Sequence, residues 1–315
     1  MSADLPRPVQ LRAALLMMAS TVAFGMMAIT IRLASRSEPT WEVAFFRNFF
    51  GFLALLPILA LPAMRSGAPA RAIRETVRSN QLPRYFLRCL IGISSMFCGF
   101  WAIGNLPLSQ AISLAYSSPI FVTIAAALWL GETVRLRRWL AVAAGFIGVL
   151  VIVRPWSQAF SPSLLIALLA AMLNAVVAIQ IKQLSRADGS DTIVFWTYIF
   201  WIPMSLLPAI FVWHAPQGIA WLWLALCGVL GTIGQLLWTR ALKLGEVSAL
   251  TPISFLQLPV VTLAGWLLFE EVIDGWTAAG ALIIFCATAY IAHREATLAR
   301  RNASNSPSEA VEPGN

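Results

Sequence analysis

Long apolar stretches, separated by short polar segments, dominate the pattern of this chain. A helix needs roughly 20 apolar residues to cross the hydrocarbon core of a bilayer. Ten stretches approach that length, near residues 13–34, 43–63, 86–104, 109–130, 138–154, 162–181, 192–212, 219–239, 247–269 and 276–292. They are too uniformly apolar for the alternating strands of a membrane β-barrel. Because backbone polar groups must be satisfied internally in lipid, the pattern predicts an all-α membrane protein with ten transmembrane helices.

The composition agrees with this prediction, and the charges predict an orientation. Of 315 residues, 59% are hydrophobic and 11% are charged, whereas soluble domains carry about 25% charged residues. With a cytoplasmic N-terminus, 18 of the 22 Arg and Lys residues fall inside, Arg88 among them. Arg32, Arg36 and Arg154 then lie outside, and Arg47 is the only charge counted within a span. The positive-inside rule therefore predicts that both termini are cytoplasmic.

The two halves of the chain resemble one another. The stretch AITIRLASR at 28–36 returns as AIQIKQLSR at 178–186, and each copy closes the first span of its half. Glu132 and Glu271 likewise follow the fourth and ninth spans. Five spans per half is an odd number, so the second half inserts upside down, as a five-plus-five inverted repeat. We expect, in order, a cytoplasmic N-terminus at 1–12, repeats at 13–154 and 162–292, and a disordered cytoplasmic tail at 295–315.

Two motifs carry a resemblance to a known family. SSPIFVTIAAALWLGE at 117–132 and QLPVVTLAGWLLFEE at 257–271 each combine a mid-helix proline with a terminal Glu. With the duplication, they make residues 11–293 similar to the drug/metabolite transporter superfamily, EamA type. The resemblance implies a transporter, not an enzyme, with helices 1, 3, 4, 6, 8 and 9 around a cavity. Helices 5 and 10 would buttress this cavity and could pair protomers as a homodimer.

Polar side chains within the spans are candidates for contact with a solute, because facing lipid costs free energy. Arg47 offers a bidentate partner for a carboxylate or phosphate. The alternatives for Arg47 are a structural role against carbonyls and an outward, snorkelling side chain. The other candidates lie on helices that the resemblance assigns to the cavity, and each could equally serve as a contact between helices. They are Ser94, Ser95, Tyr116, Ser118, Asn174, Gln235, Phe255 and Gln257.

Several kinds of chemistry are not indicated by the sequence. His, Asp and Glu form no cluster at membrane depth, so we expect no metal, no cofactor and no catalytic residues. The basic residues behind the net charge of +8 lie mostly in the predicted cytoplasmic loops, where anionic membrane lipid is the expected partner. The charge therefore does not indicate nucleic-acid binding. Pro119 and Pro259 stand in matching positions and are candidate hinges for alternating access, with static kinks as the alternative.

The leading hypothesis is a transporter of the bacterial inner membrane that exports a small polar metabolite. A neutral polar cavity with aromatic walls suits an amino acid or an amino-acid-derived compound, such as an opine-type metallophore. The alternative is an importer of S-adenosylmethionine, riboflavin or a similar nutrient. EVAFFRNFF at 42–50 is similar to the second helix of carriers of both kinds and does not select a solute. An intramembrane enzyme and a channel are remote alternatives.

Overall fold

The structure is a computed structural model that describes residues 7–65, 77–129, 136–157, 160–184, 187–244, 253 and 256–305. These residues form eleven helices and no strand. The helices are α1 (Arg7–Ala34), α2 (Thr40–Arg65), α4 (Leu82–Asn105), α5 (Leu108–Ala115), α6 (Ser118–Trp129), α7 (Leu136–Val153), α8 (Ser163–Leu184), α9 (Ser190–Phe211), α10 (Ala220–Leu244), α12 (Gln257–Phe269) and α13 (Gly275–Asn305).

Most of these helices are suited to a bilayer. Six contain stretches that are long and apolar enough to cross it, in α1, α2, α4, α8, α9 and α10. α7, α12 and part of α13 are shorter apolar helices. Large apolar side chains such as Leu15, Leu53 and Leu169 are exposed on the outer surface, where lipid would cover them. The chain is therefore a multi-pass membrane protein, as the apolar pattern predicted.

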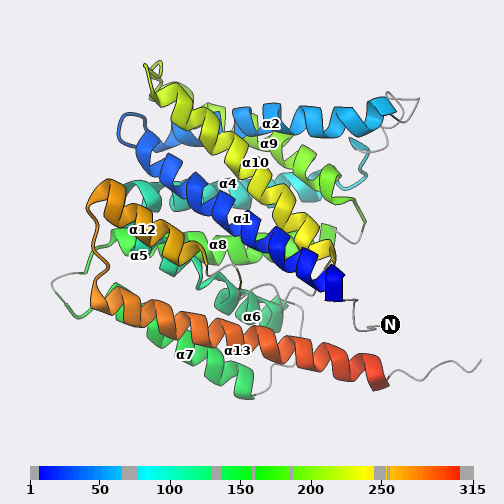
Figure 1. Ribbon diagram of the computed structural model, residues 1–315, viewed down its shortest axis with the longest axis vertical. Coiled ribbons are helices and arrows are strands. Elements are labelled where there is room, and N and C mark those ends of the chain that lie inside the picture. Colours follow the sequence, from blue (N-terminus) through cyan, green and yellow to red (C-terminus); the bar gives the residue numbers. More distant parts are fainter. Residues whose placement is uncertain are drawn as a thin grey trace, which may run out of the picture.

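The helices pack in pairs that join distant parts of the chain. α1 lies along α10, and α8 lies along α4. α2 also packs on α10, and α9 packs on α4. α2 and α9 contact each other at one end of the molecule, while α7 and α13 lie side by side at the other end (Figure 1). α5 and α12 meet between these two ends.

Glycines on α10 allow its neighbours to approach closely. A Cβ atom at Gly228 would stand 2.7 Å from the backbone nitrogen of Gly51 on α2. A Cβ atom at Gly234 would stand 2.9 Å from the ring of Phe24 on α1. Lipid tails are as apolar as leucine, so membrane helices associate through close packing between small residues. The spacing of glycines on α10 therefore determines how α1 and α2 are placed.

The fourth predicted span is not one continuous helix, and in this respect the prediction is wrong. α5 ends at Ala115 and α6 begins at Ser118, with Tyr116 and Ser117 between them. Pro119 has no backbone N–H and lies in the first turn of α6, where an N–H would have no helical acceptor. Pro119 was expected to lie in mid-helix, and instead it begins a new helix.

The ninth and tenth spans also differ from the expected boundaries. α12 begins at Gln257, so Pro259 again lies in a first turn. The preceding residues 245–252, with Phe255, lie outside the described part of the chain. α13 continues as helix to Asn305, past residue 295, where the tail was expected to begin.

The pair α7–α13 depends on a close approach at Gly280, and this gives a first prediction. A Cβ atom at Gly280 would stand 2.5 Å from Ile152 Cγ1 and 2.7 Å from the carbonyl oxygen of Gly148. Gly280→Ala should lower the stability by about 1–3 kcal/mol, because backbone cannot move aside as a flexible side chain does. Thermal unfolding in detergent would measure this loss.

The matched control lies on the same helix. A Cβ atom at Gly275 would meet nothing within 4 Å, so Gly275→Ala should leave the melting temperature near that of the wild type. Equal melting temperatures for the two variants would show that α7 and α13 are not packed as described.

Candidate functional site

A hydrogen bond joins the break between α5 and α6 to the start of α12. Tyr116, at the end of α5, donates its hydroxyl to Oε1 of Gln257, the first residue of α12, over 3.0 Å. Both side chains are half-buried. Two residues that the sequence predicted for the cavity are thus brought together, although they lie in different halves of the chain.

The surroundings of this pair come from both halves. α1 passes close to α12, because a Cβ atom at Gly25 would stand 3.0 Å from Val260 Cγ1 and 3.6 Å from Gln257 Cγ. Ser117 donates its hydroxyl to the carbonyl oxygen of Leu114 over 2.6 Å, and Ser118 is buried at the start of α6. Interrupted helices and neutral polar side chains suit binding of a polar solute.

The other predicted cavity residues do not gather into one cluster. Ser95 donates to the carbonyl oxygen of Ala170 over 2.9 Å and so connects α4 with α8. Ser94 donates to Leu90 of its own helix and is exposed. Asn174 on α8 is exposed, and Gln235 on α10 is half-buried. Of these residues, Ser95 forms a contact between two helices, which is the alternative to solute binding that the sequence left open.

Arg47 lies inside the protein and does not snorkel outward. Its side chain is buried, with 7% of the residue exposed. Nη1 donates to Oδ1 of the neighbouring Asn48 over 2.9 Å, and no backbone carbonyl accepts from this guanidinium in the described part of the chain. The guanidinium carbon lies 5.7 Å from the ring centres of both Tyr198 and Trp201. Glu42 does not pair with it.

Arg88 is a second buried cation, which the sequence analysis counted with the cytoplasmic charges. It lies in the membrane-spanning part of α4 with 5% of the residue exposed, so Arg47 is not the only charge within a span. Arg88 donates to Thr197 Oγ1 over 2.6 Å, and its guanidinium carbon lies 5.3 Å from the Trp201 ring centre. The position of Arg88 inside the predicted span 86–104 was the signal that could have revealed it.

An ion pair connects the ends of four helices, α1, α4, α5 and α12. Arg32, at the end of α1, lies 2.9 Å from Glu271 Oε1, just after α12. The second oxygen of Glu271 accepts the backbone N–H of Leu108, the first residue of α5, over 2.8 Å. Arg32 also donates to the carbonyl oxygens of Ile103 and Gly104 at the end of α4. The cluster satisfies polar groups that would otherwise be unpaired at helix ends.

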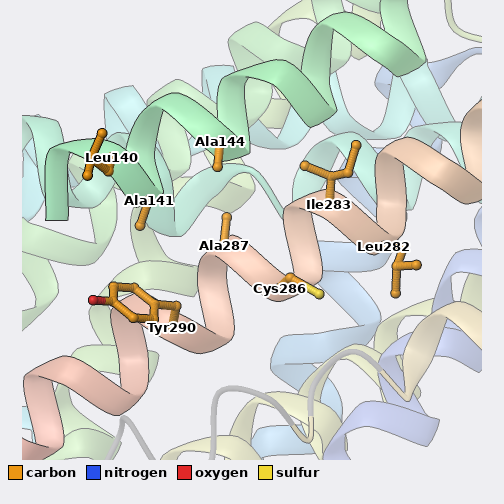
Figure 2. Close-up of a pocket in the computed structure, with 8 residues that line it drawn as sticks. All are labelled: Leu140, Ala141, Ala144, Leu282, Ile283, Cys286, Ala287 and Tyr290. Carbon is orange, nitrogen blue, oxygen red and sulfur yellow. The ribbon is translucent and has the colours of Figure 1, made fainter. Parts of the chain in front are cut away.

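A groove lies between α7 and α13, away from these polar groups. Figure 2 shows its lining and the two helices that provide it. Its volume is about 590 Å³, and its lining residues are Leu140, Ala141, Ala144, Leu282, Ile283, Cys286, Ala287 and Tyr290. None of these side chains is charged, so the groove fits apolar chains such as those of lipid and gives a polar solute few partners. Within the described residues, no group of His, Cys, Asp and Glu could hold a metal ion.

A family profile and individual relatives both identify this chain with one group of transporters. The profile of the EamA-like transporter family matches residues 11–154 and 161–292. The riboflavin transporter of Vibrio cholerae is 31% identical over 295 residues, covering 92% of this chain and 96% of that protein. The pseudopaline exporter CntI of Pseudomonas aeruginosa is 30% identical over 280 residues, covering 87% and 93%.

A further relative and a solved structure agree with this result. The S-adenosylmethionine uptake transporter of Rickettsia felis is 29% identical over 259 residues, covering 81% of this chain and 84% of that protein. A crystal structure matches with a TM-score of 0.62 at 19% identity, covering 90% of this chain and 98% of the other, which shows a shared fold. From its family match and its relatives, this chain belongs to the EamA-like transporter family.

Proposed function

We propose that this protein carries a small polar metabolite across the bacterial inner membrane by alternating access. The observation that carries this proposal is the hydrogen bond between Tyr116 and Gln257, which links the two halves at the ends of short helices. A single neutral hydrogen bond contributes only about 0.5–1.5 kcal/mol net, so a solute can replace it at little cost. Ser118, at the start of α6, is a further proposed residue of this site. Ser94, Ser95, Asn174 and Gln235 do not gather with it and remain separate candidates for contact with the solute.

The helix pairing supports a ten-span inverted repeat with halves at 13–154 and 162–292. In an inverted repeat, the main contacts between helices have counterparts in which the two halves exchange roles. The first and eighth spans pair as α1 with α10, and the sixth and third pair as α8 with α4. The second and eighth pair as α2 with α10, and the seventh and third as α9 with α4.

The prolines support hinges at the two helix starts. Pro119 lies in the first turn of α6, and Pro259 lies in the first turn of α12. A proline in a first turn stiffens the start of its helix, and for α6 the helix is interrupted just before it, at Tyr116 and Ser117, where a change of angle breaks no continuous helical ladder. α6 and α12 would then swing about Pro119 and Pro259 as the solute site opens to one side and then the other.

Export of an amino acid or an amino-acid-derived compound is the proposed direction, and import of a nutrient is the competing one. The pseudopaline exporter is a relative that favours export. The riboflavin and S-adenosylmethionine transporters are relatives that favour import. Uptake of labelled riboflavin and S-adenosylmethionine into right-side-out vesicles tests the second candidate. Metabolite profiling of a deletion strain tests the first, since an exported compound accumulates inside the cell.

The orientation gives a prediction that reporter fusions can check. A fluorescent protein joined after Asn315 should fluoresce, because it remains in the cytoplasm with the C-terminus. Alkaline phosphatase joined after Gln217, in the segment between α9 and α10, should be active, because it reaches the periplasm. The physical reason is that 17 of the 22 basic residues then lie on the cytoplasmic side, once Arg88 is counted within a span. Active phosphatase at the C-terminus would contradict the ten-span topology.

The site gives a prediction for Tyr116→Phe and Gln257→Leu. Each variant should reach the membrane at normal abundance and transport more slowly. Removing the Tyr116 hydroxyl should cost roughly 2- to 10-fold in transport, as expected for loss of one net hydrogen bond. Vesicle transport normalised to protein level gives the measurement, with Tyr290→Phe as the matched control, because Tyr290 is an exposed tyrosine on α13.

The double variant separates a shared role from two independent roles. If the two side chains act through one contact, Tyr116→Phe combined with Gln257→Leu should transport no worse than Gln257→Leu alone. Losses that multiply, or normal transport by both single variants, would argue against a common site at the two helix breaks.

A further inference from the structure

Two buried arginines converge on one tryptophan within the membrane-spanning part of the protein. Arg47 comes from α2, Arg88 from α4, and Trp201 from α9. Their guanidinium carbons lie 5.7 Å and 5.3 Å from the centre of the Trp201 ring. An indole face attracts cations. Here the shared contact also brings two positive charges near each other. The indole ring lowers the free-energy cost of burying each guanidinium but neutralises neither charge.

Both guanidinium groups retain donors that have no acceptor. A guanidinium has five N–H donors in a planar fork. Arg47 uses one on Asn48, and Arg88 directs one nitrogen at Thr197 and the sulfur of Cys89. The Nε atoms of Arg47 and Arg88 are both buried without a hydrogen-bond partner. Orphaned charged donors of this kind are costly in a protein interior, and an acceptor from outside the chain would lower that cost.

Among the described residues, neither Glu42 nor Asp188 pairs with these arginines. Glu42, on the same helix as Arg47, accepts the backbone N–H of His214 over 2.7 Å through one oxygen, and its other oxygen is buried without a partner. Asp188 accepts the hydroxyl groups of Tyr85 and Ser79. Within the described part of the chain, no salt bridge reaches Arg47 or Arg88. The two positive charges therefore lack an internal counter-ion among these residues.

Glycines on α10 and α4 let the side chains of Arg47 and Trp201 lie close against the neighbouring backbone. A Cβ atom at Gly231 on α10 would stand 3.2 Å from Nε and 3.3 Å from Nη2 of Arg47. A Cβ atom at Gly92 on α4 would stand 2.9 Å from Cζ2 of Trp201. Polar neighbours extend the site, because Asn48 donates to Ser205 over 3.2 Å, and Thr197 contacts Arg88. The surroundings are those of a polar site and not of a lipid-facing surface.

We infer that Arg47, Arg88 and Trp201 form a binding site for an oxyanion, a carboxylate or phosphate group carried by the transported solute. Paired guanidinium forks match the oxygen atoms of such groups in geometry and charge. The inference rests on the proposed carrier function only in naming the solute as the source of the anion. It places a negatively charged group on the substrate, whereas Tyr116 and Gln257 meet neutral polar groups.

The experiment measures thermal unfolding of the purified protein in neutral detergent. Inorganic phosphate and succinate are the probes, each compared with chloride at the same ionic strength. Both probes should raise the melting temperature by a few degrees, because a ligand that binds only the folded state stabilises it. Arg47→Gln and Arg88→Gln should each abolish the rise. Arg84→Gln should retain it, because Arg84 is an exposed arginine of the same helix that donates to Gln81.

A second variant keeps the test decisive if the arginine variants do not fold. Asn48→Asp is nearly isosteric and puts a carboxylate 2.9 Å from Arg47 Nη1, in place of the amide oxygen. This internal anion should maintain or raise the melting temperature in chloride and should remove the response to phosphate and succinate. Wild-type protein whose melting temperature ignores both probes would overturn the inference.

A lipid headgroup offers the same phosphate chemistry, and a separate measurement distinguishes the two sources. If phosphatidylglycerol in the micelle raises the melting temperature and free phosphate cannot compete with it, the site holds lipid and the solute assignment is overturned. Competition by free phosphate supports the solute. Because unfolding does not depend on transport, failure here leaves the carrier proposal intact. A protein that binds phosphate but transports nothing would contradict the carrier proposal alone.

Discussion

The hydrocarbon core of a bilayer holds almost no water, so most polar groups inside this protein find a partner within the protein itself, on the same helix or on another. Helix ends show this most directly. Glu271 accepts the N–H of Leu108 at the start of α5 while it pairs with Arg32, which in turn donates to carbonyl groups at the end of α4. A single charged pair therefore satisfies the ends of several helices. Interruption of a helix is tolerated in this protein because side chains replace the missing backbone bonds.

The same constraint explains why small residues lie at helix contacts. In lipid, the hydrophobic effect does not drive helices together, and association depends on close packing and hydrogen bonds. Gly228 and Gly234 allow α10 to approach α2 and α1, and Gly280 allows α13 to approach α7. Gly231 and Gly92 differ from these, because they face Arg47 and Trp201 and leave room for large polar and aromatic side chains. Glycine therefore allows close contacts between helices at some positions and leaves space for large interior side chains at others.

Two polar centres of different character result from this packing. The contact between Tyr116 and Gln257 is neutral and joins short helices whose breaks suit movement. The centre at Arg47, Arg88 and Trp201 is cationic and is built from long helices, α2, α4 and α9. In the proposed carrier, the cations would bind an anionic group and the neutral pair would bind a neutral polar group.

The sequence by itself determined the membrane class, the positions of most spans and the polar residues worth attention. It could do so because burial of apolar side chains and the cost of charge in lipid act locally, residue by residue. Arg47 and Gln257 were found in this way. The break at Tyr116 and Ser117 was not, because Pro119 is compatible both with a kinked helix and with the start of a new one.

Tertiary structure alone decided which side chains meet. Tyr116 and Gln257 are 141 residues apart, and Arg88 and Thr197 are 109 residues apart. No local pattern encodes such a pairing, because it depends on which helices become neighbours and on how each is rotated about its axis. Arg88 was assigned to the cytoplasmic side because it lies near the end of its predicted span. Position along the sequence does not show in which direction the side chain points. Its burial beside Trp201 is a consequence of α4 packing on α9.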